Sequence, residues 1–243
     1  MSETQNPSRA GLARALSKLG FCSRKQAFSL IRAGGVRINN RLVRDPETPV
    51  RLGKDCIEVD GKAVRPAGKV YLMLNKPRGI VTTRSDEKGR KTIYSLLPES
   101  ADWLAPAGRL DMASEGLLFL TNDSGWGARI ASPEAHVEKT YHVQIAAVAD
   151  QELLDRMRRG VRTEDGKFLA VKRASILRWG KKNSWLEIVL DEGKNRHIRR
   201  MLSELKIEVL RLVRVAVGSV ELGDLPKGKT RPLTTKEKEA LMR

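Results

Sequence analysis

Residues 108–120 read Gly-Arg-Leu-Asp-Met-Ala-Ser-Glu-Gly-Leu-Leu-Phe-Leu and decide how the larger part of this chain folds. The apolar run Leu117–Leu120 is continuous, which predicts a buried strand. Asp111 stands a few residues before that strand, so its carboxylate is held on a rigid element and can face a cleft. An aspartate at such a place can also be a turn or helix-capping residue, and the rest of the chain must decide between the two.

The same run is similar to the Gly-Arg-Leu-Asp signature of the pseudouridine synthases, in particular the RsuA-like family that acts on ribosomal RNA. The similarity extends through Gly116-Leu117-Leu118 and Thr121-Asn122-Asp123, which makes it more specific than a tetrapeptide. This resemblance implies that Asp111 is the catalytic carboxylate. It also implies an α+β fold, in which a small α/β N-terminal RNA-binding domain precedes a catalytic domain with a mostly antiparallel sheet.

The charge of the chain points to nucleic acid. Its 243 residues include 46 Lys and Arg against 29 Asp and Glu, a net charge of +17. Such an excess predicts a polyanionic partner, because cations that neutralise phosphates release counterions. No apolar run approaches the roughly 20 residues that span a bilayer, and Met1–Pro7 holds no apolar core of a secretory signal. We therefore expect a cytoplasmic protein that binds no membrane.

Nothing in the sequence indicates a metal or another cofactor. Cys22 and Cys56 stand outside any paired metal motif, and His136, His142 and His197 are scattered. The sequence also contains no P-loop and no dinucleotide fingerprint. We expect a protein without a cofactor, and a monomer, because no coiled-coil pattern or large apolar stripe remains.

The first 66 residues are the most densely basic part, with 13 Lys and Arg against 6 Asp and Glu, a net of +7. Apolar residues at helical spacing predict a helix over residues 12–19, and Ser23 is an N-cap for a second helix that ends at Gly34-Gly35. Short strands follow, with turns at Asn39-Asn40 and Asp60-Gly61. The pattern predicts two helices and a small sheet.

This order of elements resembles the S4-type RNA-binding domain over residues 8–66, on the strength of Leu12–Leu16, Ser23–Ala27 and Gly35–Asn39. The resemblance implies that the paired helices contact structured RNA. Each basic residue there can instead belong to a solvated helix face. Phosphate contacts position a protein and do not specify a base, so we expect this domain to aid docking. The candidate phosphate contacts are Arg14, Arg24, Lys25, Arg32 and Arg37.

Residues 65–69 are predicted to be a linker, and residues 69–243 the catalytic domain. An apolar strand over residues 70–74 runs into the turn Asn75-Lys76-Pro77-Arg78-Gly79, another feature of the RsuA-like family, whose basic side chains are expected to face RNA. Glu138-Lys139-Thr140-Tyr141 resembles the family's Glu-Lys-x-Tyr motif, which implies that Tyr141 packs on the target base. An aromatic suits this task, because a base flipped out of folded RNA loses its stacking; a tyrosine of the core is the alternative.

A helix is predicted after Glu192-Gly193, because the apolar residues of 198–205 follow helical spacing and leave the basic ones off that face. Backbone amides at a helix start attract anions. The segment is similar to the family motif Glu-Gly-(Lys/Arg)-x-x-x-(Val/Ile)-Arg-Arg-Met, which implies that Arg199 pairs with Asp111 and leaves His197 without a catalytic role. The predicted catalytic residues are Asp111, Tyr141 and Arg199, and the predicted substrate-binding residues are Arg109, Lys76, Lys194, Arg196, Arg200 and Ile188.

The resemblance implies the isomerisation of a uridine to pseudouridine in ribosomal RNA or an assembling ribosomal subunit, and Gly193–Arg196 favours the large subunit. The alternatives are the same reaction on small-subunit RNA, a non-catalytic RNA-binding or ribosome-assembly protein, and a DNA-binding regulator with a helix-turn-helix in residues 8–33. An enzyme requires that Asp111, Tyr141 and Arg199 converge in one pocket, whereas a binding protein does not.

Overall fold

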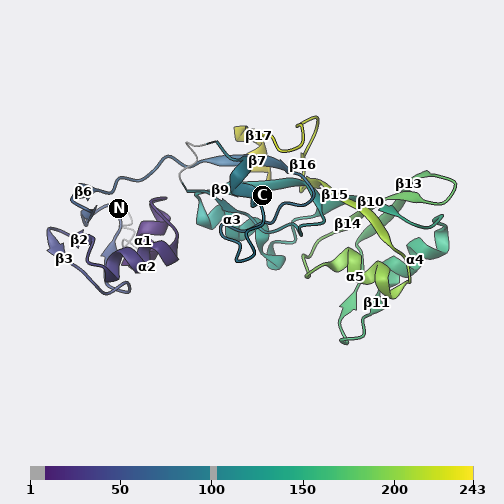
Figure 1. Cartoon of the computed structure of the whole chain (residues 1–243), viewed down its shortest axis with the longest axis horizontal. Coiled ribbons are helices and arrows are strands. Elements are labelled where there is room, and N and C mark those ends of the chain that lie inside the picture. Colours follow the sequence, from purple (N-terminus) through teal and green to yellow (C-terminus); the bar gives the residue numbers. More distant parts are fainter. Residues whose placement is uncertain (1–8, 99–102, 243) are drawn as a thin grey trace, which may run out of the picture. The chain divides into compact units, whose positions relative to one another are not determined.

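The structure is a computed structural model that describes residues 9–98 and 103–242. The chain forms two compact units (Figure 1). The first runs to Val70 and takes in two short later segments, and the second contains most of the remainder. Ser8 and Arg243, the outer limits predicted for the two domains, lie outside the described residues. Within the described residues, no helix has the length and apolar character needed to cross a membrane.

Two short helices form one side of the first unit. They are α1 (Leu12–Lys18) and α2 (Arg24–Arg32). Ser23 caps α2 as predicted: its hydroxyl accepts a hydrogen bond from the Gln26 backbone N–H, and the Gln26 side chain accepts one from the Ser23 N–H. This reciprocal pair satisfies two amide groups that the first turn of a helix leaves without partners.

Short antiparallel strands complete the first unit. The apolar faces of both helices share one core with these strands, in which Leu12, Ile31 and Val36 are fully buried. Asp60 (φ 47°) and Gly61 (φ 75°) form the tight turn that the sequence predicts between two strands. The strands are β1 (Arg9–Gly11) paired with β4 (Pro49–Arg51), and a sheet in the order β3 (Arg41–Leu42), β2 (Val36–Ile38), β5 (Ile57–Val59) and β6 (Lys62–Ala63).

One large, mostly antiparallel sheet organises the second unit, so the predicted α+β class is confirmed. β15 and β9 run parallel to each other, and they meet through Val213 opposite Glu115 and Arg214 opposite Gly116. The order is β13 (Arg173–Trp179), β14 (Ser184–Leu190), β10 (Lys139–Ile145), β15 (Val209–Val217), β9 (Glu115–Thr121), β7 (Tyr71–Lys76) and β17 (Thr230–Pro232), with β16 (Val220–Glu221) beside β15 and β8 (Ala105–Pro106) beside β9.

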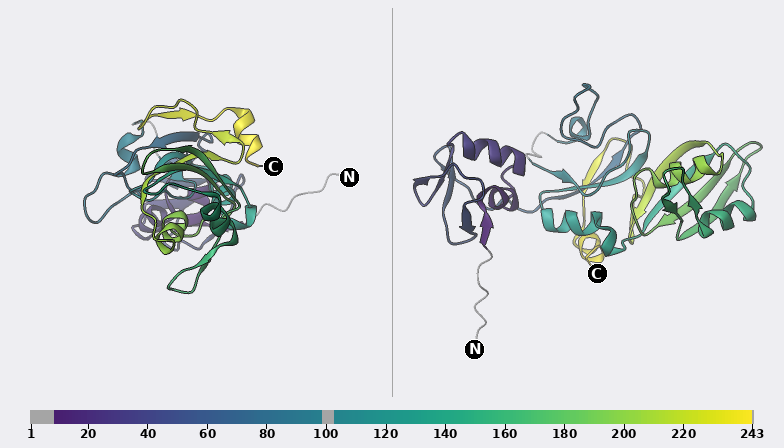
Figure 2. Two further views of the ribbon diagram at one scale, coloured as in Figure 1. Left: turned by 90° about the vertical axis from the view of Figure 1, so that its right-hand side faces the viewer. Right: turned by 90° about the horizontal axis from the view of Figure 1, so that it is seen from below.

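Helices cover this sheet in two places. α4 (Gln151–Arg159) and α5 (His197–Glu204) pack on one face of β10, β13 and β14 and build the larger apolar core with them (Figure 2). α3 (Ser124–Ala131) packs against β7 and β9 in a second core. The remaining elements are α6 (Thr235–Ala240), the 3-10 turns η1 (Ile93–Leu96) and η2 (Pro133–Ala135), and the hairpin of β11 (Val161–Arg162) and β12 (Phe168–Leu169).

β9 is anchored at a crowded point of the sheet. All seven of its residues are buried, as the apolar run predicts. Gly116 has a φ of +103°, and a Cβ at this position would collide with the backbone of Arg214. Only glycine allows both this conformation and this close approach. The segment before β9, which carries Asp111, is therefore attached to a rigid part of the sheet.

Candidate active site

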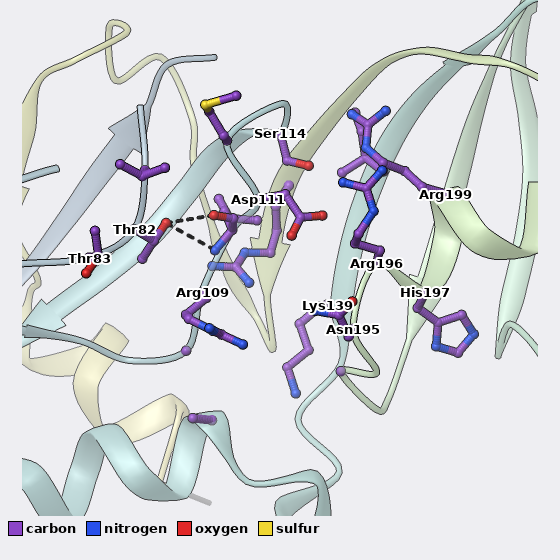
Figure 3. A pocket seen from close by; sticks show the side chains of 18 of the residues that line it. Thr82, Thr83, Arg109, Asp111, Ser114, Lys139, Asn195, Arg196, His197 and Arg199 are labelled. Carbon is purple, nitrogen blue, oxygen red and sulfur yellow. Dashed lines mark hydrogen bonds between the residues drawn. The ribbon is translucent and has the colours of Figure 1, made fainter. Parts of the chain in front are cut away.

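A pocket of about 670 Å³ opens in the second unit, and Asp111 points into it (Figure 3). Its walls come from the segment before β9, from β10, from the end of β14, from the loop that leads into α5, and from β15. Asp111, Tyr141 and Arg199 all line this one pocket. The three residues predicted to be catalytic, which are up to 88 positions apart in the chain, are thus brought together as an enzyme requires.

Five consecutive backbone carbonyls, from Leu110 to Ser114, accept hydrogen bonds from other segments. The donors are Lys76 at the end of β7, Gly79 and Thr82 in the segment that follows β7, and Arg199 of α5. Because every bond ends on a main-chain oxygen, the loop is held while the Asp111 side chain stays directed into the pocket (Figure 3). The bonds run from Thr82 Oγ1 to Leu110 O (2.7 Å), Lys76 Nζ to Asp111 O (3.1 Å), Gly79 N to Met112 O (2.8 Å), Arg199 Nη2 to Ala113 O (2.9 Å) and Lys76 Nζ to Ser114 O (2.9 Å).

Lys76 is a structural cation and not a surface one. Its side chain is 0% exposed, and its ammonium also donates to Pro77 O at 3.1 Å. Burial lowers the pKa of Lys76 to about 8, although the nearby charges of Asp111 and Glu115 favour the protonated form. Three carbonyls around one ammonium satisfy its three donors. The turn Asn75–Gly79 therefore holds the Asp111 loop through Lys76 and Gly79.

Arg199 reaches the same loop from α5. Its Nη2 donates to Ala113 O, and its Nη1 donates to Val209 O at 3.4 Å. Burial is the main cause that lowers the pKa of Arg199, the charge of Arg196 adds to it, and the charge of Asp111 opposes it. Among the ion pairs within residues 9–98 and 103–242, none joins Arg199 to Asp111 directly. In place of the predicted ion pair, Arg199 places a positive charge near Asp111 and donates a hydrogen bond to the backbone of the Asp111 loop.

Tyr141 lies on β10, where it faces Ile188 of β14 on one side and Arg214 of β15 on the other. Tyr141 is partly exposed and lines the pocket. Lys139 also lines this wall and is 8% exposed, and burial, aided by the charge of Arg214, lowers its pKa. Arg214 itself is 6% exposed and donates to Leu117 O at 2.8 Å.

The loop before α5 adds exposed cations to the pocket. Lys194 pairs with Glu192 at 2.7 Å and donates to Phe168 O at 3.1 Å. Arg196 has a φ of 49° and stands immediately before the helix. His197 is 3% exposed, and burial lowers its pKa, so the imidazole is neutral at pH 7.

No group of three or more His, Cys, Asp or Glu side chains in residues 9–98 and 103–242 is arranged to hold a metal ion.

Three predicted substrate-binding residues do not line the pocket. Lys76 is buried beneath the Asp111 loop, contrary to the expectation that the basic side chains of its turn all face RNA. Ile188 is fully buried in the core that α4 and α5 form with the sheet. Arg200 turns to Asp165 and Thr163 instead. Arg109, Lys194 and Arg196 do line the pocket and are exposed.

Several residues of the site escaped the sequence analysis. The hydroxyl of Thr82 accepts a hydrogen bond from the Leu110 backbone N–H (3.3 Å) and donates one to the Leu110 carbonyl. Thr82 lies in a polar stretch without periodicity, so the sequence did not single it out. Lys139 and Arg214 line the pocket from strands. A Lys or Arg inside an apolar strand pattern was the signal available for both, because such a residue is rarely buried without a specific partner.

In the first unit, the five cations predicted to contact phosphates are all exposed. Arg24, Lys25 and Arg32 lie on α2, and Arg14 on α1. Arg37 lies on β2 and donates to Asn40 O at 3.2 Å. These side chains are accessible to an anionic ligand.

Comparison with known proteins agrees with this geometry. The profile of RNA pseudouridylate synthases matches residues 70–204, and the profile of the S4 domain matches residues 11–56. An uncharacterized RNA pseudouridine synthase of Aquifex aeolicus is 40% identical over 224 residues, which cover 91% of this chain and 89% of that protein. Ribosomal large subunit pseudouridine synthase B of Bacillus subtilis is 35% identical over 232 residues, covering 95% and 94%.

A solved structure extends the similarity to three dimensions. The crystal structure of a pseudouridylate synthase matches with a TM-score of 0.67 and 31% identity, over 96% of this chain and 99% of that one. The sequence matches, the fold and the pocket therefore lead to one conclusion: the chain belongs to the RNA pseudouridylate synthase family and carries an S4 domain in its N-terminal part.

Proposed function

We propose that this RNA pseudouridine synthase modifies a specific uridine of ribosomal RNA, that of the large subunit, with Asp111 as its catalytic carboxylate. The observation that carries the role of Asp111 is its direction into a pocket that Tyr141 and Arg199 share. The name of the Bacillus subtilis relative supports the large subunit as the source of the RNA. Small-subunit RNA is the second candidate.

The reaction breaks the N-glycosidic bond of the uridine, rotates the uracil and rejoins it through carbon five. It is redox-neutral, so a positioned carboxylate suffices for its bond changes. Asp111 can attack the anomeric carbon of the sugar as a nucleophile, assist formation of a glycal by removing a ribose proton, or attack the uracil ring. In each route the fixed Leu110–Ser114 backbone keeps the carboxylate in one place relative to the base.

The neighbours of Asp111 have separate tasks in this proposal. Tyr141, which is partly exposed at the pocket wall, offers its ring as a stacking partner for the flipped uracil. Arg199 donates a hydrogen bond to Ala113 O and keeps a positive charge near Asp111. Arg109, Lys194 and Arg196 are accessible at the pocket wall for phosphate groups of the RNA around the target.

The two domains divide the work of recognition. Residues 8–66 act as the docking domain, with Arg14, Arg24, Lys25, Arg32 and Arg37 on phosphates, and residues 69–243 catalyse the reaction. The enzyme acts as a monomer on ribosomal RNA or an assembling subunit, which places it in the cytoplasm.

Pseudouridine mapping tests the proposal. Ribosomal RNA from cells with and without the protein is labelled with carbodiimide and read by primer extension, and Asp111→Asn serves as the control. We expect one large-subunit stop that wild type restores and Asp111→Asn does not. A restored stop with Asp111→Asn would remove the catalytic role of Asp111, and a stop in small-subunit RNA would reassign the substrate.

A further inference from the structure

The face of the large sheet opposite α4 and α5 carries a second hollow. This hollow has a volume of about 420 Å³ and shares no lining residue with the Asp111 pocket. We call it the rear groove. Trp185 of β14 lines it together with side chains of β10, β13 and β15. Its lining residues are His142, Leu177, Arg178, Trp185, Arg211, Val213 and Val215.

The pairing of the strands places the groove residues in a row. Arg178 of β13 lies opposite Trp185, Trp185 lies opposite Gln144 of β10, and Gln144 lies opposite Arg211 of β15. The guanidinium carbon of Arg178 is 5.1 Å from the centre of the Trp185 ring, and that of Arg211 is 5.8 Å from it. Both guanidinium groups thus lie over the indole ring, and the three side chains together offer planar groups on which a base can stack and two cations that can bind phosphates.

The charge around the groove is positive. Lys181 and Lys182 are exposed in the turn between β13 and β14, next to this row. Glu115 lies beside Arg211, but two cations share it, Arg211 at 2.8 Å and Lys227 at 2.6 Å. Glu187 lies in the neighbouring row of residues, opposite His142, and its Oε2 is 3.5 Å from Nε2 of that histidine. An anionic ligand therefore meets more positive than negative charge.

Three consecutive residues at the start of β15 connect the groove to the active site. Arg199 donates to Val209 O, Arg78 donates to Leu210 O at 3.5 Å, and Arg211 faces the groove. The charge of Arg78 also lowers the pKa of Arg199, so Arg78 is close to the pocket. Basic side chains thus continue from the Asp111 pocket to Trp185 around this end of the strand.

We propose that the rear groove is a binding site for a single-stranded stretch of the RNA substrate that flanks the target uridine. One base stacks on the cluster that Trp185 forms with the guanidinium groups over its ring, and the adjoining phosphates bind Arg178, Arg211 and the Lys181–Lys182 turn. Alternating phosphates and stacked bases are the pattern that single-stranded nucleic acid presents to a protein. The inference rests on the RNA substrate of the proposed function, and it adds a second contact region outside the catalytic pocket.

The test measures binding of a fluorescein-labelled oligouridylate of about 12 nucleotides to the full chain, over a series of salt concentrations. All variants carry Asp111→Asn so that no turnover occurs. We expect Trp185→Ala to weaken binding roughly tenfold, as loss of one base stack does, and Trp185→Phe to retain most of it. Lys181→Gln with Lys182→Gln should lower the slope of log K against log salt by about 1.4, or 0.7 for each lost phosphate contact.

Arg156→Gln with Arg159→Gln is the matched control, because both arginines are exposed on α4, on the covered side of the sheet, and their loss changes the net charge equally. An equal loss of slope in the control pair would overturn the groove in favour of diffuse attraction. Unchanged binding in a folded Trp185→Ala protein would also overturn it and leave a protein partner as the occupant of this face.

Two further measurements separate this inference from the proposed function. Photocrosslinking with a 4-thiouridine oligonucleotide is expected to label a peptide that contains Arg178–Glu187, and crosslinks confined to other peptides would contradict the groove. In the enzyme with Asp111 intact, Trp185→Ala is expected to raise KM for a flanked substrate and leave kcat unchanged. If the wild type itself does not modify ribosomal RNA, the proposed function fails, whereas binding and crosslinking still decide the groove.

Discussion

The two units differ in that the second one also buries some of its Lys and Arg residues. In the first unit, the candidate RNA contacts on α1, α2 and β2 are exposed. In the second, Lys76, Lys139 and Arg214 are at most 8% exposed; Lys76 donates to three backbone carbonyls, and Nε of Arg214 donates to one. Exposed cations attract phosphates and are screened by salt, whereas buried ones must be satisfied by the protein and so fix geometry. The cations behind the net charge of +17 therefore have two different roles: the exposed ones can bind phosphates, and the buried ones hold the protein backbone in place.

Asp111→Asn is expected to give the largest effect, because it should abolish catalysis in the second unit and leave RNA binding by both units intact. Removal of the carboxylate is expected to lower kcat by more than about 10³-fold, the order of effect of a lost acid–base or nucleophilic group. RNA affinity should stay within about twofold, because the cations of both units remain. Single-turnover kinetics and a binding titration on the same RNA measure the two quantities. A large loss of affinity would mean that docking also depends on Asp111.

Lys76→Met tests whether the buried cation holds the loop. The change leaves three carbonyls without their donor, and we expect it to lower the free energy of unfolding by about 2–3 kcal/mol, the size of a lost hydrogen bond to a charged group. Activity should fall as well, because the Asp111 loop is released. Urea unfolding measures the stability, and exposed Lys62→Met is the control with an expected change below about 0.5 kcal/mol. Equal effects of the two changes would contradict the comparison.

Arg24→Gln with Lys25→Gln tests the exposed cations. If each residue contacts one phosphate, RNA affinity should fall several-fold, and the slope of log K against log salt should decrease by about 1.4–1.8. At saturating RNA, kcat should not change. An unaltered salt slope would show that these side chains belong to a solvated helix face.

Ser23→Ala is expected to cost about 1 kcal/mol of stability, because the Gln26 backbone N–H loses the hydroxyl that accepts its hydrogen bond, while the bond from the N–H of residue 23 to the Gln26 side chain remains possible. Since α2 carries Arg24, Lys25 and Arg32, fraying of its first turn should also weaken RNA binding slightly. Thermal unfolding followed by circular dichroism measures the change, and Ser23→Asp, which retains a capping oxygen, should recover most of it. No recovery with Asp would assign the loss to another cause.

The smallest effect concerns a half-buried ion pair between β17 and α6. The side chain of Arg231 hydrogen-bonds Glu237 and lowers the pKa of that carboxyl from 4.5 to about 2. A depressed carboxyl pKa stabilises the folded state above pH 4.5, and this contribution is lost as the pH falls from 4.5 towards 2. Glu237→Gln should flatten the dependence of stability on pH in this window. An unchanged acid limb would mean that the pair contributes nothing measurable.

Much of the fold could be predicted from local pattern. The buried strand before Thr121, the cap at Ser23, the turn at Asp60-Gly61 and the helix after residue 197 follow from periodicity and turn chemistry, which act over a few residues. The convergence of Asp111, Tyr141 and Arg199 could be predicted from the family resemblance, because no local pattern specifies contacts between distant segments.

The positions of Lys76, Arg200 and Ile188 could not be predicted, because they depend on which side chains the tertiary structure buries. Lys76 stands at the end of a strand and the start of a turn, and sequence alone does not say which side of that boundary is buried. Arg200 follows Arg199 directly, yet a helical step of 100° sends it to Asp165 and away from the pocket. Ile188 lies between Glu187 and Val189 in β14, and only the packing of α4 and α5 shows that its side chain belongs to the core.

The hydrogen bonds to the Leu110–Ser114 backbone have a consequence for how this enzyme can diversify. Because the donors recognise carbonyl oxygens, the shape of the loop does not depend on the side chains of Met112 and Ala113. Met112 is 42% exposed and lines the pocket. These two positions can therefore change during evolution or in a designed library while the carboxylate stays in register, so substrate preference can vary separately from the chemistry.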